Sequence, residues 1–589
     1  MINTAWNMQN LPREKLIMSF TNAEVAEAFE TIAILLELEG ANPFRIRAYR
    51  NAARVIQLLP EPITDLIAQK KDLTEYKGIG TDLAGKIKAF LETGHIPLMD
   101  ELITHHPLGI TELTRIENLG PKRIKRLHRE LGVSTITDLK SACENELVRS
   151  LKGFGEKTEK KILIEINELL KKGESKRLLW SRADEVAQKI VTHLKKSKDI
   201  KRIEVAGSYR RRKETVGDLD IVISCSSPEK VMDHFFSFED IQSIQSQGIT
   251  RSTIILRSGL HVDLRAFKEE SFGSGLYYFT GSKSHNIAIR KIARKKGMKL
   301  NEYGVFKGEE YLAGKSEEEI FKLMKLDFIP PELRENNGEI EAAMNHLLPD
   351  LITRENICGD LHTHTLATDG RDSIEEMALK AKAMGLQYIA ITDHSQSLRI
   401  AHGLDLKRLE KHIKDIDEAN EKKLGIKILK GIEVDILEDG SLDLPNDILK
   451  ELDIRICSVH SKLRMKRGAM TKRILKAMEN PYFNVLGHPT GRLILKREPS
   501  ELDFEKIIQS AVASGTFFEI NGQPDRLDLD AEHARLAQEL GAKFAINSDA
   551  HSTMELNFIQ NGIFQARRGW IEKKNVINGL SWSHLKKLL

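Results

Sequence analysis

The chain has 589 residues, with 90 Lys and Arg against 86 Asp and Glu, so its net charge of +4 is nearly neutral and about four domain-sized units are expected. Its four cysteines include no close pair, which argues against a disulfide scaffold or a thiolate zinc site. Neither a signal-peptide core nor an apolar stretch of the roughly 20 residues that span a bilayer occurs, so we expect a soluble intracellular protein.

The first region, about residues 21–173, has helical patterning and an excess of Lys and Arg. A short glycine pattern recurs there three times between helical stretches: Lys77-Gly-Ile-Gly-Thr81, Asn118-Leu-Gly-Pro-Lys122 and Lys152-Gly-Phe-Gly-Glu156. Glycine allows a tight turn with positive φ and lets a phosphate approach the free amides of the next helix. The pattern predicts helix-hairpin-helix elements that bind the DNA backbone; the plainer alternative is a helical bundle with glycine caps. The expected contacts are Gly78, Gly80, Gly120, Lys122, Gly153 and Gly155.

The segment from Gly80 to Lys86 imitates a phosphate-binding loop of nucleotide-binding enzymes. Ile87 stands where that motif requires Ser or Thr, and no buried strand precedes the segment. We therefore exclude a nucleotide-binding loop at this position.

Strand-like runs follow between about residues 200 and 267, and they carry a group of carboxylates. Asp218 and Asp220 are two residues apart on one strand and so face the same way, and Asp263 on another strand can join them. Three carboxylates with little histidine suit two Mg²⁺ or Mn²⁺ ions, which can activate a 3′-hydroxyl and hold a leaving pyrophosphate. The residues expected to hold the triphosphate are Gly207, Ser208, Arg211 and Gly217.

Pro330-Pro331 and the polar stretch 335–338 mark the main linker of the chain. Beyond it, strands alternate with amphipathic helices, and several helices end in a glycine just before the next strand. These glycines are Gly385, Gly425, Gly515 and Gly541. Such alternation with short connections predicts a parallel, barrel-like fold.

Nine metal-type ligands are spread over this last region, most of them directly behind a short apolar run. They are His362, His364, Asp369, His394, Glu433, His460, His488, Asp549 and His551. A β/α barrel brings the carboxyl ends of its strands to one site, so these side chains are expected to meet there. Nine ligands exceed the needs of one ion and predict two or three, and imidazole-rich sites favour Mn²⁺, Zn²⁺ or Fe²⁺ over Mg²⁺. Such clusters typically hydrolyse phosphoesters.

Residues from about 21 to 328 resemble a family X DNA polymerase of the DNA polymerase beta type. The resemblance is carried by Gly207-Ser208, Asp218-Leu-Asp220 and Asp263. It implies that the segment 278–282, with Tyr278, Phe279 and Gly281, contacts the incoming sugar, and that Asn286 and Arg290 contact the nucleotide and the template. The stretch 300–303 matches as well. His261 departs from the pattern, because animal relatives carry Arg there.

The resemblance also makes the helical front a lyase-like domain followed by fingers. Lys86 matches the lysine that forms a Schiff base with a 5′-deoxyribose phosphate, and Tyr49 matches an aromatic residue of the same pocket. Asp82 replaces a lysine of the animal pattern, so the cationic crowding that would lower the pKa of Lys86 is weaker here. The alternative is that Lys86 only contacts phosphate.

Residues 357–575 resemble the PHP domain, named for polymerase and histidinol phosphatase. The motifs are Asp360-Leu-His-Thr-His364, Thr392-Asp-His394, Gly487-His-Pro489 and Asn547-Ser-Asp-Ala-His551. The resemblance implies that all nine ligands bind a trinuclear centre, and Asn521 becomes a candidate contact to phosphate or to a ligand.

Together these resemblances imply a bacterial-type PolX architecture. The expected fold is multidomain, with all-α helix-hairpin-helix domains, an α+β nucleotidyltransferase palm and thumb, and a C-terminal distorted β/α barrel. The expected boundaries are 1–105 for the lyase-like domain, 106–178 for the fingers, 179–268 for the palm, 269–330 for the thumb, 331–356 for a linker, 357–575 for the PHP domain and 576–589 for a tail.

The expected function is gap-filling DNA polymerase and 3′–5′ exonuclease in base excision repair, acting on gapped or primer-template DNA with dNTPs. Further candidate activities are 3′-phosphatase, AP endonuclease and lyase. The protein is expected to be a monomer in the bacterial cytoplasm, at the nucleoid. One alternative is a phosphatase for a small phosphate ester with a DNA-anchoring front half; another is a non-catalytic repair scaffold. Arg210-Arg-Arg-Lys213 favours a 5′-phosphate on gapped DNA or forms a solvated loop.

Overall fold

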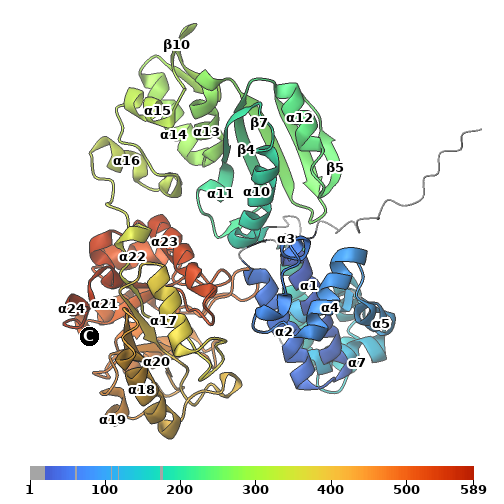
Figure 1. Ribbon diagram of the computed structural model, residues 1–589, viewed down its shortest axis with the longest axis vertical. Coiled ribbons are helices and arrows are strands. Elements are labelled where there is room, and N and C mark those ends of the chain that lie inside the picture. The colour runs from blue at the N-terminus through green and yellow to red at the C-terminus, as the bar shows by residue number, and fades with distance from the viewer. Residues whose placement is uncertain are drawn as a thin grey trace, which may run out of the picture. The chain divides into compact units, whose positions relative to one another are not determined.

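The computed structural model describes residues 20, 22–59, 61, 63–107, 109–116, 119–172 and 177–589. The chain forms two compact units, Met1–Ser175 and Lys176–Leu589. The first unit is helical and is coloured blue to cyan in Figure 1. Its helices are α1 (Asn22–Glu39), α2 (Pro43–Leu58), α3 (Ile63–Ala68), α4 (Thr81–Thr93), α5 (Pro97–His105), α6 (Gly109–Glu112), α7 (Pro121–Leu131), α8 (Ile136–Glu144) and α9 (Glu156–Lys172). Within the described residues, no helix is long and apolar enough to cross a membrane.

Each of the three glycine patterns forms a turn that leads into a longer helix. A short 3-10 helix precedes each turn (Leu73–Glu75, Leu113–Arg115 and Val148–Ser150), and α4, α7 and α9 follow. Gly78 and Gly153 have φ of +102° and +88°, a conformation in which glycine avoids a steric cost. Asn118, in the second pattern, lies outside the described residues. The expected helical hairpins are confirmed.

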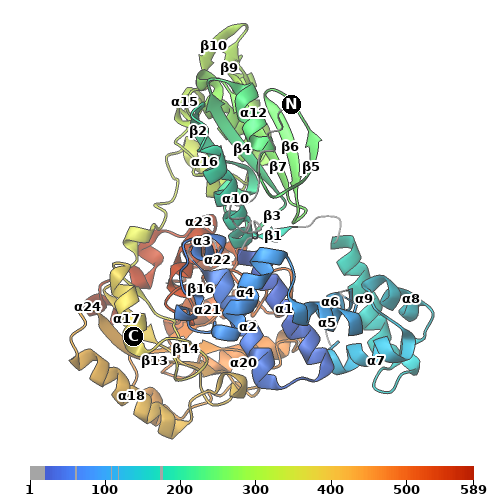
Figure 2. The ribbon, with the colours of Figure 1, turned by 45° about the vertical axis from the view of Figure 1, so that its right-hand side comes forward.

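The first part of the second unit contains a five-stranded sheet in the order β2-β4-β7-β6-β5, which Figure 2 shows beside α12. β4 and β7 are parallel and the other neighbours are antiparallel. The bounds are β2 (Ile200–Val205), β4 (Asp218–Cys225), β5 (Ile241–Ser246), β6 (Arg251–Leu256) and β7 (His261–Phe267). β5 was not expected from the sequence, because that edge strand is polar and mostly exposed.

The two faces of this sheet pack against different helices. Leu219, Ile221 and Ile223 of β4 share a core with α10 (Trp180–Leu194) and α12 (Pro228–Phe236). Val222 faces the opposite side, where it packs with residues of α13 (Phe272–Thr280). Since side chains alternate along a strand, Asp218 and Asp220 also face the α13 side.

A smaller helical and hairpin region follows, built on its own core. Its elements are α13, α14 (Lys283–Lys295), β8 (Lys299–Asn301), β9 (Gly304–Lys307), β10 (Glu310–Ala313) and α15 (Glu317–Met324). Leu333 and Ala343 also pack into this core, Ala343 from α16 (Glu339–Met344). The segment expected to be a linker is therefore packed against the region that precedes it.

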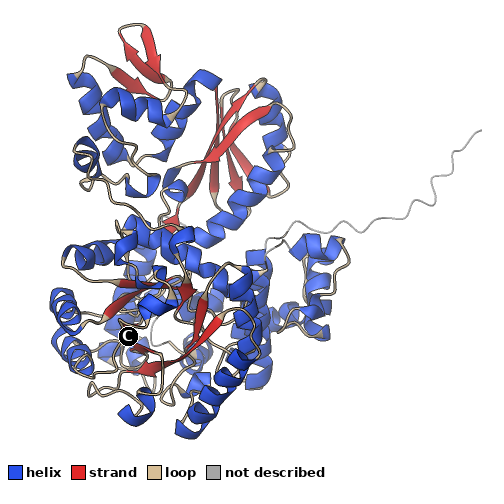
Figure 3. Ribbon diagram, turned by 60° about the vertical axis from the view of Figure 1, so that its left-hand side comes forward, coloured by secondary structure: helices blue, strands red, loops and turns tan. Residues whose placement is uncertain are grey.

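The last part of the chain is a barrel-like sheet of seven parallel strands in sequence order, confirming the expected fold class. The strands are β11 (Gly359–Asp360), β12 (Tyr388–Ile391), β13 (Lys427–Asp435), β14 (Ile454–Ser458), β15 (Val485–Leu486), β16 (Phe517–Asn521) and β17 (Phe544–Asn547). A bridge between Thr363 and Ala550 joins the ends of the first and last strands, so the barrel is nearly closed. Figure 3 shows these strands in red with helices in blue around them.

Helices α17 (Ile374–Ala383), α18 (Leu406–Glu421), α20 (Arg467–Ala477), α21 (Phe504–Ser514), α22 (Ala531–Glu539) and α23 (Ile559–Arg568) cover the barrel, with the short α19 (Asn446–Leu449) and α24 (Trp582–Leu585). Tyr388 and Ala390 of β12 belong to the core inside the barrel, whereas Ile389 and Ile391 belong to the core beneath the helices. Strands buried on both faces read as continuous apolar runs, which explains the sequence pattern.

The four glycines expected to end helices all do so with positive φ. Their φ angles are +82° at Gly385, +82° at Gly425, +77° at Gly515 and +92° at Gly541. These turns allow short connections, so that each helix is followed at once by the next strand. The candidate ligands that follow the strands therefore meet at one end of the barrel.

Two candidate metal centres

The first centre lies on the five-stranded sheet, where the three expected carboxylates converge. Asp220 of β4 lies opposite Asp263 of β7 in the parallel register, and Asp218 begins β4. Burial, and then the charges of Asp218 and Asp263, raise the pKa of Asp220 to about 7. Carboxylates that oppose one another's ionisation gain from a bound divalent cation, so these oxygens fit Mg²⁺ or Mn²⁺.

Neighbouring residues hold this group in place. Thr253 Oγ1 donates a hydrogen bond of 2.5 Å to Asp263, and Arg265 Nη2 lies 3.2 Å from the same carboxylate. A Cβ on Gly207, whose φ is +64°, would lie 2.7 Å from Asp220 Oδ2. Only glycine therefore lets the turn pass so close to the carboxylate. His261, the departure from the family pattern, is exposed and pairs in register with Asp218.

The expected triphosphate turn is the short helix α11 (Gly207–Arg210), which begins with Gly207 and Ser208. Gly217 lies directly before β4, and a Cβ there would be 3.1 Å from the Arg177 guanidinium. Arg211 Nη1 donates to Thr280 O at 2.5 Å, and its Nε donates to Glu335 at 3.1 Å. The turn is therefore tied to the region that starts with α13.

The residues expected to contact the sugar and the template cluster in that region. Asn286 Nδ2 donates to Tyr278 O at 2.7 Å, and Arg290 Nε donates to Asn286 O at 3.3 Å. The Arg265 guanidinium lies 4.1 Å from the centre of the Phe279 ring. Gly281 has a φ of +66°, and a Cβ there would be 3.2 Å from Arg211 Nη1.

The basic run Arg210–Lys213 has partners inside the protein. Arg210 donates to both oxygens of Glu317 at 2.9 and 2.7 Å, and Arg212 lies 4.5 Å from the centre of the Trp180 ring. Lys213 Nζ is 3.7 Å from Glu335. The run is therefore a packed turn and not a solvated loop.

In the first unit, Lys86 of α4 forms an ion pair with Asp82, the residue that departs from the animal pattern. Its Nζ lies 6.0 Å from the centre of the buried Tyr49 ring, so the two residues expected to share a pocket are neighbours.

The hairpin turns of the first unit expose uncapped helix ends. Gly80 and Gly120 are the N-caps of α4 and α7, and neither helix has a side-chain cap hydrogen bond. A Cβ at Gly80, Gly120 or Gly155 would meet nothing within 4 Å, so the backbone is open there. Lys122 follows in the first turn of α7. Free amides beside a lysine are suited to a phosphate group.

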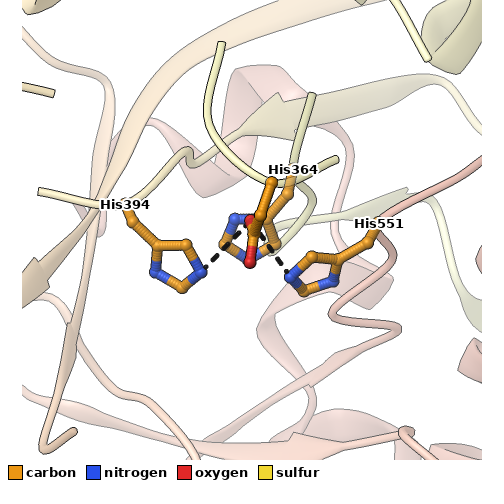
Figure 4. Close-up of side chains that lie close together, drawn as sticks. His364, His394 and His551 are labelled. Atoms are coloured by element: carbon orange, nitrogen blue, oxygen red, sulfur yellow. Dashed lines mark ion pairs between the residues drawn. The ribbon is translucent and has the colours of Figure 1, made fainter. Parts of the chain in front are cut away.

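The second centre lies at the carboxyl ends of the barrel strands, where the structure brings all nine expected ligands together. Ligand atoms lie within 4.8 Å of one another in three groups: His364, Asp369, His394 and His551; His362, His364 and Asp549; and His394, Glu433 and His460. Figure 4 shows the imidazoles of His364, His394 and His551 around one point. His488 joins them, because its Nε2 is 2.9 Å from Glu433 Oε1.

Two carboxylates connect the groups. Glu433 Oε2 lies 2.7 Å from His394 Nδ1 and 3.5 Å from His362 Nε2, and its other oxygen lies 3.2 Å from His460 Nε2. Asp549 Oδ1 lies 3.2 Å from His364 Nε2 and 3.6 Å from His362 Nε2. Carboxylates with oxygens shared among several imidazoles are suited to bridging adjacent ions.

The donor atoms fit metal ions. The Nε2 atoms of His362 and His364 are buried and have no hydrogen-bond partner, which is costly unless a cation takes the lone pairs. Burial, and then the neighbouring His551 and His394, lower the pKa of His364 to about 4, so its ring is neutral. Burial also opposes protonation of His460, but Glu433 and Asp435 outweigh it and raise the pKa of His460 to about 10. A metal ion would replace that proton.

Residues behind the ligands, not named in the sequence analysis, orient them. Glu519 of β16 is fully buried, with Oε1 2.7 Å from His362 Nδ1 and Oε2 accepting from His488 N at 2.7 Å. Asp435 Oδ1 lies 3.0 Å from His460 Nδ1. Asn521 donates to Glu519 at 3.1 Å and Asp549 at 3.0 Å, so it contacts a ligand carboxylate. Such bonds fix the imidazole tautomer that presents Nε2 to a metal.

Comparisons with known proteins match the regions that carry both centres. Family models match as a helix-hairpin-helix domain (residues 20–96), a SAM-like helix-hairpin-helix tandem (110–168), a DNA polymerase beta palm (180–268), a DNA polymerase beta thumb (275–335) and a PHP domain (360–557). The DNA polymerase/3′–5′ exonuclease PolX of Bacillus subtilis (strain 168) is 38% identical over 570 residues, which is 96% of this chain and 99% of that protein. The chain belongs to the PolX family.

Other relatives match a shorter part of this PolX chain. A probable phosphatase of Thermoanaerobacter sp. (strain X514) is 33% identical over 233 residues, 37% of this chain and 89% of that protein. A probable phosphatase of Caldanaerobacter subterraneus subsp. tengcongensis is 33% identical over 221 residues, 35% of this chain and 80% of that protein. The PolX assignment confirms the expected palm, thumb, helix-hairpin-helix and PHP architecture, with the palm at residues 180–268, the thumb at 275–335 and the PHP domain at 360–557.

Proposed function

We propose that the chain is a gap-filling DNA polymerase and a 3′–5′ exonuclease, acting in base excision repair. The observation that carries the proposal is the presence of two chemically different ligand sets, one of carboxylates alone and one rich in imidazoles. The full-length relative from Bacillus subtilis supports it, because its name gives both activities.

At the palm, Asp218, Asp220 and Asp263 would hold two Mg²⁺ or Mn²⁺ ions, and the nine PHP ligands would hold two or three Mn²⁺, Zn²⁺ or Fe²⁺ ions. Bound ions of these kinds activate a 3′-hydroxyl or a water molecule and stabilise charge on phosphate oxygens. The turn from Gly207 to Arg211 would hold the triphosphate through its amides and the Arg211 guanidinium. Tyr278, Asn286 and Arg290 would align the incoming nucleotide on the template.

In the PHP domain, Glu519 and Asp435 would keep His362 and His460 in the tautomers that bind metal. The burial of His362, His364 and Glu433 removes water from the ligand atoms and so would strengthen their electrostatic interactions with bound cations. The product would be a primer shortened at its 3′ end. The same centre would also serve 3′-phosphatase or AP endonuclease activity.

The helical unit would bind gapped DNA through the amides at Gly80, Gly120 and Gly155 without reading bases. We propose dRP or AP lyase activity at Lys86 on the strength of its contact with Tyr49. Borohydride trapping on a 5′-deoxyribose phosphate tests this, and an undiminished adduct in Lys86→Ala would exclude Lys86. The protein would act as a monomer at the nucleoid in the bacterial cytoplasm.

Paired substitutions on one labelled substrate test the two centres. On gapped duplex with Mg²⁺ or Mn²⁺, Asp218→Ala with Asp220→Ala should abolish primer growth and leave primer shortening. His362→Ala with His364→Ala should abolish shortening and leave growth. Circular dichroism of each variant controls for folding. Loss of both activities in either folded double variant would contradict two separate centres.

A second candidate is a phosphatase for a small phosphate ester, with the first 330 residues serving to anchor it on DNA. The shorter relatives favour it, because they are probable phosphatases. Fast hydrolysis of p-nitrophenyl phosphate by a protein that neither extends nor shortens DNA ends would establish this candidate. The His362→Ala, His364→Ala variant provides the matched control for contaminating phosphatase.

A further inference from the structure

The palm loop that follows the triphosphate turn is bound by side chains of the PHP domain. Glu214 lies in this loop, between Arg211 and the catalytic Asp218. Arg492 donates to both Glu214 oxygens, at 2.7 and 3.2 Å, and Gln565 Nε2 donates to one of them at 2.8 Å. The side chains of Arg492 and Glu214 are 12% and 26% exposed, so the pair is largely shielded from water. A paired, two-point contact of this kind fixes the orientation of the loop as well as its distance.

Arg212, two residues closer to the turn than Glu214, packs against aromatic rings from both domains. Its guanidinium lies 4.0 Å from the centre of the Phe564 ring of α23 and 4.5 Å from that of Trp180 of the palm. Trp180 Nε1 donates to Tyr209 O at 2.9 Å. Arg212 has a φ of +54°, a conformation that a residue with a side chain adopts only when its surroundings hold it. The PHP domain supplies part of those surroundings.

A third contact reaches the turn itself. Arg568 Nη1, also from α23, donates to the carbonyl oxygen of Arg211 at 3.0 Å. The Arg568 guanidinium is also 3.6 Å from Glu335, the carboxylate that accepts from Arg211 Nε. Arg568 therefore contacts both the backbone of Arg211 and the partner of its side chain.

We propose that the PHP domain is a structural part of the polymerase site. Arg492, Phe564, Gln565 and Arg568 act as positioning residues that hold the palm turn in the shape that binds the nucleotide triphosphate. A guanidinium aids phosphoryl transfer only when its geometry is set before the substrate arrives. This inference rests on the proposed role of Arg211 in nucleotide binding.

The plainer alternative is that these contacts only join the two domains. Arg567, the neighbour of Arg568 on α23, separates the two explanations. It donates to Glu332 at 2.8 Å and to Ile352 O at 3.1 Å, so it joins the PHP domain to the end of the thumb and to the segment that follows, and it does not contact the turn. General domain joining predicts the same effect from Arg567 as from Arg568, whereas positioning of the turn does not.

Single-nucleotide insertion on gapped DNA tests the inference with the full chain. Arg568→Ala and Arg492→Ala should raise the KM for dNTP about tenfold with a smaller change in kcat, because they loosen nucleotide binding. Arg568→Lys should recover part of the affinity, and Arg567→Ala should leave KM unchanged. Exonuclease activity of Arg568→Ala on the same DNA should equal that of the wild type. Thermal unfolding establishes that each variant is folded.

A double-variant cycle tests the Glu214 contact and does not depend on Arg568. If Arg492 acts through Glu214, the pair Glu214→Ala with Arg492→Ala should raise KM no more than the worse single change. An unchanged KM in folded Arg568→Ala and Arg492→Ala, or an equal rise in Arg567→Ala, would overturn the inference. Failure of the wild-type protein to insert dNTP would instead refute the proposed polymerase function.

Discussion

Glu519 provides the sharpest test of how the barrel prepares its metal ligands. The substitution Glu519→Gln keeps the shape of the side chain and removes its charge. Its oxygens accept hydrogen bonds from four donors, on His362, His488, Asn521 and Asn547, at 2.7 to 3.1 Å. A glutamine amide would point an N–H at one of those donors, so at least one buried bond is lost and His362 can adopt the wrong tautomer.

The size of the effect follows from these contacts. A buried hydrogen bond to a charged group contributes about 1.5–3 kcal/mol. Loss of a carboxylate behind a metal-binding histidine lowers metal affinity about 10- to 100-fold, which corresponds to about 1.4–2.7 kcal/mol. The two estimates agree. We expect half-maximal exonuclease activity to require about 10- to 100-fold more Mn²⁺ in Glu519→Gln, with polymerase activity unchanged.

The assay is a Mn²⁺ titration of primer shortening, together with elemental analysis of bound metal after dialysis. Asp453→Asn is the matched control, because Asp453 accepts from Lys430 N at 2.9 Å beside the start of β14, away from the ligands. The variant should bind less metal than the wild type and the control. An unchanged Mn²⁺ requirement and metal content in folded Glu519→Gln would refute the reasoning.

Two further predictions concern the polymerase half. Gly207→Ala should lower kcat/KM for insertion by at least about tenfold, because its Cβ would lie 2.7 Å from Asp220 Oδ2 at a positive φ; unimpaired insertion would show that the turn can shift. Burial opposes ionisation of Glu317, but Arg334 and Arg210 hold its pKa at about 2, below the ordinary 4.5. Ionised Glu317 therefore stabilises the fold at pH values above its ordinary pKa. This contribution is lost as the pH falls from about 4.5 toward about 2. Glu317→Gln should lower the free energy of unfolding by about 3 kcal/mol at neutral pH, with a smaller difference near pH 3; a difference in urea denaturation that does not narrow with pH would contradict this.

The sequence predicted that the nine candidate ligands of the barrel would meet, because most of them follow short apolar runs. His394, for example, comes shortly after β12, and His460 shortly after β14. The carboxyl ends of parallel strands meet, so local patterns were sufficient. Glu519 was overlooked although it offered a signal: a carboxylate inside the apolar run Phe517–Asn521 is costly to bury unless it is paired.

The basic run Arg210–Lys213 could not be interpreted from the sequence. Its partners Glu317, Glu335 and Phe564 are more than 100 residues away along the chain. The local periodicity of the sequence does not reveal such contacts, because they depend on how separate domains pack. The edge strand β5 was missed for a different reason: its pattern Ile-Gln-Ser-Ile-Gln-Ser lacks the apolar alternation that marks a half-buried strand.

The pairing of β13 with β12 and β14 places Glu433 among five imidazoles. A shift of this strand by one residue would turn the carboxylate outward and bring Val434 into its place. Cations bound by these side chains would therefore stabilise the native register of the barrel relative to shifted registers. Because the cations would bind only the native register, a free cation concentration a thousandfold above the dissociation constant would raise the free energy of unfolding by about 4 kcal/mol.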